Sequence, residues 1–241
     1  MKGLCCIVTG GSSGLGLATV RLLAQQGAKV VFSCRAPAKV QATLTALAGL
    51  EVYGIAADAA SETRKLLDFA VEKLGKLDIV VCNAAASLHK LAIEANEVEL
   101  RRLFEVNVFG VWALCQAALP YLKRSPQASI VIVSSMSAYI GTLGTGLHSV
   151  SKAALLSLVK VLSLELVPYQ IRVNGVAPGL FPNDHLSMAP EARTMLLRRS
   201  PKEQPGSYEE AAAVVCYLSS SEASYIIGET VPVAGALGFR I

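Results

Sequence analysis

Short apolar runs alternate with longer amphipathic stretches along the whole chain. The runs have the length of buried strands, and the stretches between them have the pattern of helices that pack on one side. The runs that we expect to be strands cover 4–10, 28–34, 50–58, 76–85, 128–135, 171–179 and 229–235. The stretches that we expect to be helices cover 14–27, 38–49, 62–75, 97–122, 148–167 and 208–220.

This alternation predicts the fold class. Strands and helices that alternate at this spacing form βαβ units, so we expect an α/β fold with about seven strands in a parallel, doubly wound sheet. Helices should cover both faces of the sheet, which agrees with a composition of 53% hydrophobic and 17% charged residues. Because no linker, repeat or low-complexity segment interrupts the pattern, we expect a single domain over residues 1–241.

Residues 181–206 fit no regular element. This segment contains four prolines and follows the carboxyl end of a predicted strand, which is where open α/β sheets bind their ligands. We therefore predict a substrate flap, and a plain surface loop is the alternative.

Charge and composition exclude several classes of partner. The net charge is only +4, and no cluster of Lys and Arg indicates a nucleic-acid surface. No stretch of about 20 mostly apolar residues indicates a membrane span. The six cysteines show no CxxC pairing and lie mostly in apolar runs, which favours free thiols over disulfides or a metal site. With no basic leader before the first strand, we expect a cytoplasmic protein.

The stretch TGGSSGLG, residues 9–16, follows the first predicted strand and begins the first predicted helix. Glycines allow a tight turn and bring the backbone close to a pyrophosphate, while the helix N-terminus supplies unpaired N–H groups and a positive dipole end. The strand–turn–helix context distinguishes such a site from a glycine-rich turn without a ligand. We therefore expect a dinucleotide to bind here.

The spacing of Gly10, Gly14 and Gly16 resembles the TGxxxGxG fingerprint of the short-chain dehydrogenase/reductase family. The resemblance covers the whole chain, and VCNAA, VIVSS, VSKAALLSL and VAPGL are most similar to the carbonyl/retinal reductase branch, followed by 3-oxoacyl reductases. It implies a Rossmann-type fold and an oxidoreductase that reduces a small carbonyl compound to an alcohol by hydride transfer. It also implies a homotetramer, or at least a dimer, built from the helices near 97–122 and 148–167.

The resemblance also assigns site residues. Asp58 matches the acidic residue that contacts adenine, NAAA from Asn83 stands at the family's NAG, and Pro178 and Gly179 match the pair that lies along the nicotinamide. Asn183 stands where the family usually keeps a threonine on the carboxamide. The residues expected to bind the cofactor are Gly10, Ser12, Ser13, Gly14, Leu15, Gly16, Cys34, Arg35, Asp58, Asn83, Ala84, Ala85, Lys152, Pro178, Gly179 and Phe181.

The end of the second strand predicts which cofactor binds. A ribose 2′-hydroxyl favours a carboxylate at this position, whereas a 2′-phosphate favours a cation. Cys34 occupies the carboxylate position and Arg35 follows it. We therefore expect NADP(H), and the alternative is that Arg35 is an ordinary solvated charge.

The family's catalytic pattern is present with one change. Asn107 and Ser135 match the catalytic asparagine and serine, but the YxxxK signature reads His148-Ser-Val-Ser-Lys152. Tyr139 has no lysine four residues later, so we do not expect it to substitute for the missing tyrosine.

Histidine can act as a general acid or base, with an unperturbed pKa near 6.5. The neighbouring Lys152 and a nicotinamide cation should both lower the pKa of His148, and the imidazole is shorter than a phenol. We therefore expect altered or weakened reductase chemistry. The alternatives are a catalytically inactive relative that still binds NADP(H), or an interaction protein that senses this nucleotide.

Overall fold

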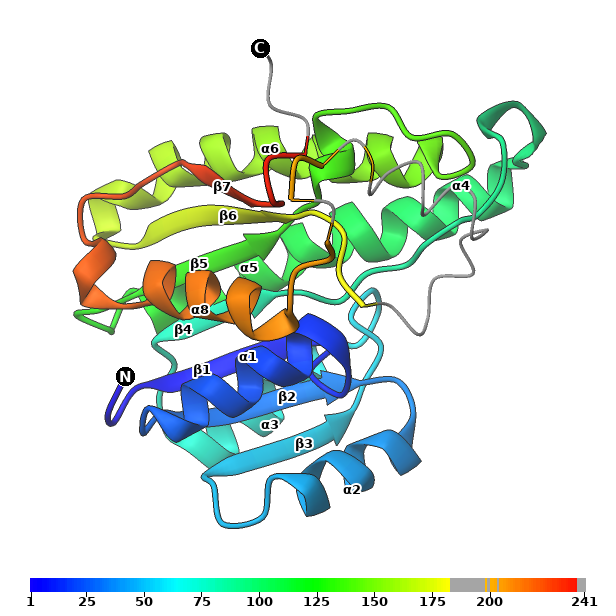
Figure 1. Ribbon diagram of the computed structural model, residues 1–241. Helices are drawn as coiled ribbons and strands as arrows, with labels where there is room; N and C mark the ends of the chain where they lie inside the picture. The colour runs from blue at the N-terminus through cyan, green and yellow to red at the C-terminus, as the bar shows by residue number, and fades with distance from the viewer. Residues whose placement is uncertain (183–197, 199, 203, 238–241) are drawn as a thin grey trace.

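Seven parallel strands form one sheet in the computed structural model of the protein (Figure 1). The structure describes residues 1–182, 198, 200–202 and 204–237. The order across the sheet is β3-β2-β1-β4-β5-β6-β7, which confirms the predicted doubly wound parallel sheet. The strands are β1 Cys5–Thr9, β2 Lys29–Cys34, β3 Val52–Ala56, β4 Ile79–Cys82, β5 Ser129–Val133, β6 Arg172–Pro178 and β7 Thr230–Val233.

Helices cover both faces of the sheet because successive strand residues point to opposite sides. On one face, α1, α2 and α8 pack against buried residues such as Val8 and Phe32; α1 and α8 lie in front of the sheet in Figure 1. On the other face, α3, α5 and α6 pack against residues such as Ile7 and Ile132. The α-helices are α1 Gly14–Gln25, α2 Pro37–Ala46, α3 Thr63–Leu74, α4 Glu97–Phe104, α5 Gly110–Leu122, α6 Gly146–Leu166 and α8 Tyr208–Ser219.

The stretch expected as one helix over 97–122 is interrupted. A capping box between Asn96 and Glu99 begins α4, and a π-helical turn, Glu105–Phe109, separates α4 from α5. Turns of this kind often occur at functional sites because the extra residue redirects a side chain. Here the turn contains Asn107, which is fully buried.

By length and composition, the helical stretch Glu97–Leu122 could cross a membrane, which the sequence analysis did not anticipate. In the fold, however, Val111, Leu114 and Ala118 of this stretch are part of the core beneath the sheet. A core helix is as apolar as a spanning helix, so composition alone does not separate the two.

The strand order reverses at β1, which lies between β2 and β4. The connections that leave β1 and β4 therefore diverge to opposite sides, and a crevice opens beyond the carboxyl ends of these strands. The segments that follow all seven strands lie around this crevice.

Candidate active site

A cavity of about 950 Å³ lies at the carboxyl ends of the strands. The loops after β1, β2, β3, β4, β5 and β6 all contribute to its wall. Of the residues predicted for the site, those that line the cavity are Gly10, Ser12, Ser13, Gly14, Leu15, Gly16, Cys34, Arg35, Asp58, Asn83, Ala84, Ala85, Ser135, His148, Lys152, Pro178, Gly179 and Phe181. Asn107 does not line the cavity; it is buried and hydrogen-bonded to Ala86, which does.

The glycine-rich turn after β1 is tightly packed. A Cβ atom on Gly16 would lie 2.2 Å from the Gly10 carbonyl oxygen, so only glycine fits there. The Asn83 side chain fastens the turn, since its Nδ2 donates to the carbonyl oxygens of Thr9 at 2.9 Å and Gly10 at 3.2 Å. Asn83 thus holds the glycine-rich turn as well as lining the cavity.

The N-terminus of α1 is open to an anion. Its N-cap residue, Ser13, makes no side-chain capping bond, and the first turn contains no acidic residue. The first N–H groups of a helix have no intrahelical partner, and the positive end of the helix dipole adds to their attraction for phosphate.

The end of β2 carries two cations rather than one. Arg35 lines the cavity as expected, and Lys39, from the first turns of α2, joins it there. Cys34 directs its thiol to the Ala36 carbonyl oxygen at 3.3 Å. Ser33 also lines this region, and its hydroxyl is buried without a hydrogen-bond partner in the part of the chain that the structure describes.

Asp58 is held in place by two donors. Arg102 Nη2 donates to its carboxylate at 2.7 Å, and the Ala60 amide donates at 2.8 Å. Partial burial tends to raise the pKa of Asp58, but these hydrogen bonds outweigh burial and hold the pKa below its ordinary value. Asp58 is therefore an ionised acceptor at the cavity wall.

Asn107 organises the loop after β4. Its Oδ1 accepts from the Ala86 amide at 2.7 Å, and its Nδ2 donates to the Ala86 carbonyl oxygen at 3.0 Å. Nδ2 also donates to the Ser151 hydroxyl at 2.9 Å, which links the π-helical turn to α6. Asn107 therefore fixes the position of the Ala86 carbonyl group.

Ser135 follows β5 and is supported by Ser137, which the sequence analysis missed. The Ser137 hydroxyl donates to Ser135 Oγ at 2.9 Å, and the Ser137 amide donates to the same oxygen at 3.1 Å. Both donations occupy lone pairs of Ser135. Its own hydroxyl hydrogen is left to face a ligand in the cavity.

His148 is the third residue of α6, and its Nδ1 lies 3.2 Å from the Ala86 carbonyl oxygen. The pKa of His148 is lowered to about 4. Burial is the largest cause, and the positive charge of Lys152 and the nearby His89 act in the same direction, against the opposing effect of the Ala86 hydrogen bond. The direction agrees with the sequence expectation, but burial is a larger cause than Lys152. The ring is therefore neutral at pH 7.

Lys152 is only 3% exposed and donates from Nζ to the Val133 carbonyl oxygen at 2.8 Å. Burial lowers the pKa of Lys152 to about 8, so the ammonium form still dominates at neutral pH. A buried cation thus lies one helical turn from a neutral imidazole, at the end of the cavity that Ser135, His148 and Lys152 line, which is the candidate catalytic end.

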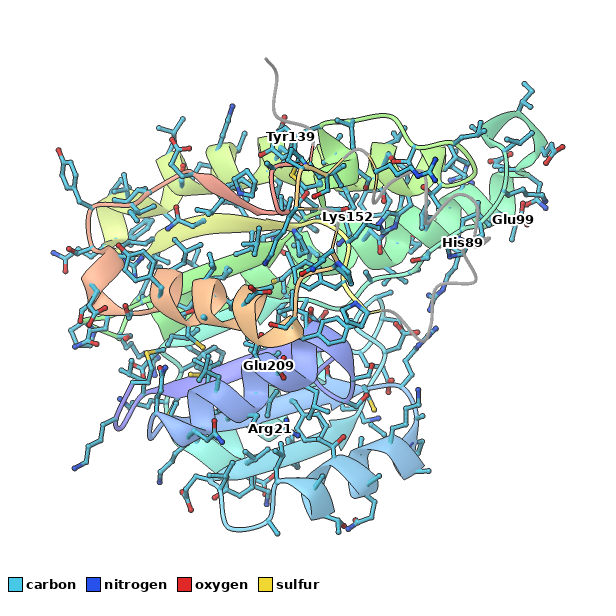
Figure 2. All side chains as sticks on the ribbon, in the orientation of Figure 1. Arg21, His89, Glu99, Tyr139, Lys152 and Glu209 are labelled. Atoms are coloured by element: carbon cyan, nitrogen blue, oxygen red, sulfur yellow. The ribbon has the colours of Figure 1, made fainter. Side chains whose placement is uncertain are left out.

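Tyr139 is about half exposed and is not among the residues that line the cavity. Figure 2 shows it at the outer edge of the molecule, whereas Lys152 lies in the interior. The predicted flap over 181–206 lies largely outside the described residues, and so does Asn183; Phe181 lines the cavity.

Comparisons with known proteins agree with this geometry. A family model described as enoyl-(acyl carrier protein) reductase matches residues 10–237. The chain is 36% identical over 248 residues to "Tropinone reductase-like 3" of Erythroxylum coca, with 100% of this chain and 95% of that protein covered. It is 37% identical to "Dehydrogenase/reductase SDR family member 4" of Sus scrofa, with 98% and 87% covered.

A bacterial relative and a solved structure extend the comparison. The chain is 31% identical to "3-oxoacyl-[acyl-carrier-protein] reductase FabG" of Thermotoga maritima, with 98% of each covered. The solved structure of a mutant short-chain dehydrogenase/reductase from Serratia marcescens superposes with a TM-score of 0.93 at 31% identity, with 99% of both chains covered.

Proposed function

Because the chain belongs to the short-chain dehydrogenase/reductase family, we propose that it is an NADP(H)-dependent oxidoreductase that reduces a carbonyl compound to an alcohol, with acid–base chemistry altered by His148. One observation carries the proposal. A single cavity joins the glycine-rich turn and two cations to the side chains of Ser135, His148 and Lys152.

The residues present fit a dinucleotide phosphate. The uncapped N-terminus of α1 offers N–H groups to a pyrophosphate. Arg35 and Lys39 offer charge to a 2′-phosphate. When bound, this cofactor supplies the hydride for the reduction. The two cations and the lack of a carboxylate at Cys34 support NADP(H) over NAD(H).

The chain's own residues would bind and polarise the substrate oxygen. Ser135 can donate a hydrogen bond to it, and the Lys152 ammonium group adds a buried positive charge nearby. His148 can donate a proton only in its charged form, which is a minor form at neutral pH because its pKa is about 4. The proposal is therefore a weak reductase at neutral pH rather than an inactive site.

The wall of the catalytic end supports an apolar substrate. Met136 and Leu237 belong to one small buried cluster, against which Ile140 and Leu180 pack, and all four line the cavity. The names of two relatives, a tropinone reductase-like protein and a 3-oxoacyl reductase, describe reductases. We therefore propose a small carbonyl compound with an apolar body as the substrate class.

The test is NADPH oxidation in the presence of diketones, quinones and retinal, with the unmutated protein and His148→Tyr. We expect slow turnover with at least one class and faster turnover for His148→Tyr, because a phenol stays protonated at neutral pH. Tight NADPH binding without turnover in either protein would refute the proposed reductase activity. That result would favour a nucleotide-sensing interaction protein.

We also propose that the protein is a cytoplasmic homotetramer, or at least a dimer. Its six cysteines are free, which suits a reducing compartment. Trp112 of α5 and Val150, Val161 and Leu164 of α6 are exposed apolar residues on the helices that the family resemblance assigns to the subunit contact. Burial of these side chains against a second copy would remove apolar surface from water.

A further inference from the structure

The hydrogen bond of His148 fixes which ring nitrogen carries the proton. A carbonyl oxygen only accepts hydrogen bonds, so Nδ1, 3.2 Å from the Ala86 carbonyl oxygen, must be the donor. A neutral imidazole has one N–H group. Because Nδ1 carries it, Nε2 presents a lone pair, and it is the nitrogen left for a ligand in the cavity that the ring lines.

The acceptor of this bond is itself held in place. The Ala86 amide and carbonyl groups are both engaged by the Asn107 side chain, at 2.7 and 3.0 Å. Asn107 is fully buried and is also anchored to Ser151 of α6. The Ala86 carbonyl oxygen therefore remains a fixed acceptor for Nδ1.

The charges around the ring oppose a second proton. Lys152, one turn further along α6, and His89, on the loop after β4, both disfavour a positive imidazole, and burial disfavours it most. No carboxylate is among the groups that act on the ring in the described part of the chain. The Nδ1–H form therefore persists through neutral pH.

Ser135 supplies the complementary hydrogen-bonding group. Its Oγ accepts from both the amide and the hydroxyl of Ser137, so its own hydroxyl hydrogen is the part left to a ligand. The catalytic end thus offers one donor, Ser135 Oγ–H, and one acceptor, His148 Nε2.

We propose that the site at neutral pH is built for the alcohol rather than the carbonyl form of its substrate, with His148 Nε2 as the general base that accepts the alcohol proton and Ser135 as the donor to the same oxygen. This rests on the NADP(H)-dependent oxidoreductase of the proposed function, and at neutral pH it favours the reverse of the reduction, oxidation of the alcohol. An alcohol oxygen satisfies both groups because it has a hydrogen and lone pairs. A carbonyl oxygen has no hydrogen, so it leaves the Nε2 lone pair facing another lone pair.

The step balances in atoms and electrons. The substrate O–H bond breaks and its proton goes to Nε2, while the electron pair of the carbon–hydrogen bond leaves as hydride to the oxidised nicotinamide cofactor of the proposed function. The carbon–oxygen double bond forms at the same carbon. Nε2 then returns its proton to solvent, which is favourable because the charged ring is disfavoured where it lies.

The two directions should differ in pH dependence. Oxidation uses the neutral ring, so its kcat/KM should be constant from about pH 5 to 7, a range in which Lys152, whose pKa is about 8, stays charged. Reduction uses the charged ring, so its kcat/KM should fall about tenfold per pH unit over the same range, because the pKa of His148 is about 4. The ratio of the two rates then changes with pH as the overall reaction, which releases one proton, requires.

The first test needs no turnover. In protein labelled with ¹⁵N-histidine, NMR distinguishes the two neutral tautomers and the charged ring, and comparison with His148→Gln assigns the His148 signals apart from those of His89 and His185. We expect the Nδ1–H tautomer of His148 at pH 7. An Nε2–H tautomer or a charged ring at this pH would overturn the proposal.

The second test measures kcat/KM in both directions from pH 5 to 7 with paired probes: acetoin and diacetyl, 1-phenylethanol and acetophenone, retinol and retinal. We expect flat oxidation and falling reduction in the unmutated protein. In His148→Tyr, oxidation should fall toward low pH, because a phenol must first lose its proton. A flat reduction profile in the unmutated protein would overturn the proposal. Absence of turnover in both directions would instead refute the proposed function, and the NMR result would still decide the tautomer.

Discussion

The cation pair at the end of β2 makes cofactor preference measurable without a known substrate. Arg35 and Lys39 line the cavity beside Cys34, where a carboxylate would bind a ribose hydroxyl. A 2′-phosphate brings close to two negative charges to this place. Because NADH has no such phosphate, any affinity that depends on it appears in the NADPH constant alone. We expect the unmutated protein to bind NADPH at least tenfold tighter than NADH, a difference of about 1.4 kcal/mol.

The change to make is Arg35→Ala. A hydrogen bond to a charged group contributes about 1.5–3 kcal/mol, so its loss should weaken NADPH binding by about 10- to 150-fold and leave NADH binding unchanged. Lys39→Ala should have a smaller effect in the same direction, because an ammonium group is a point charge without the planar fork of arginine. The double variant should bind both cofactors equally.

The assay is titration of each reduced cofactor by nicotinamide fluorescence at low and moderate salt. Arg21→Ala is the matched control, since Arg21 is exposed on the outer surface of α1 and does not line the cavity (Figure 2). It should change neither constant. Equal affinities for NADPH and NADH in the unmutated protein, or an NADH constant that changes as much as the NADPH constant in Arg35→Ala, would refute the reasoning.

Three further predictions follow from the catalytic end and the helix surface. Ser137→Ala should lower kcat about tenfold with little change in NADPH affinity, because Ser135 loses one of its two hydrogen-bond donors. Ser137→Thr keeps the hydroxyl and should keep the activity, whereas an equal loss of activity in both variants would indicate a packing role. As the pH falls from 6.5 to 4, the unfolded chain binds a proton at His148 that the folded chain excludes. The free energy of unfolding should therefore fall by about 3 kcal/mol more than in His148→Phe, which urea titration at each pH would measure. Light scattering at micromolar concentration should give the mass of a dimer or tetramer, and Trp112→Glu should lower it; a monomeric mass in the unmutated protein would end that proposal.

The sequence was sufficient for the fold because the fold depends on local patterns, and with the family resemblance it was sufficient for most of the cavity wall. Strand–helix alternation determines a parallel sheet, and such a sheet brings the ends of its strands together whatever lies between them. The glycine-rich turn and Arg35 could therefore be predicted from their positions at strand ends, whereas the resemblance to the short-chain dehydrogenase/reductase family assigned Asp58, Asn83 and Pro178. Arg35 follows β2 by one residue and was found in this way.

The remaining features depend on geometry that no spacing rule encodes. Lys39 reaches the cavity only because α2 begins at Pro37 and turns back toward β2. Ser137 contacts Ser135 through a short 3₁₀ turn that the pattern does not reveal. The tautomer of His148 depends on a carbonyl group 62 residues away in the chain, which is in place because a π-helical turn points Asn107 inward.

The construction of the cavity from the ends of seven strands has a consequence for finding the ligands of this protein. A molecule bound there touches segments spread over most of the chain, from residue 10 to residue 237, so it cannot stay bound if any large part of the sheet opens. A ligand that binds only the folded state stabilises it by about 2.7 kcal/mol at a free concentration a hundred times its dissociation constant. The melting temperature should therefore respond to every occupant of the cavity, reactive or not. Thermal denaturation can rank nucleotides first, and then alcohols and ketones on the nucleotide-loaded protein, before any reaction has been observed.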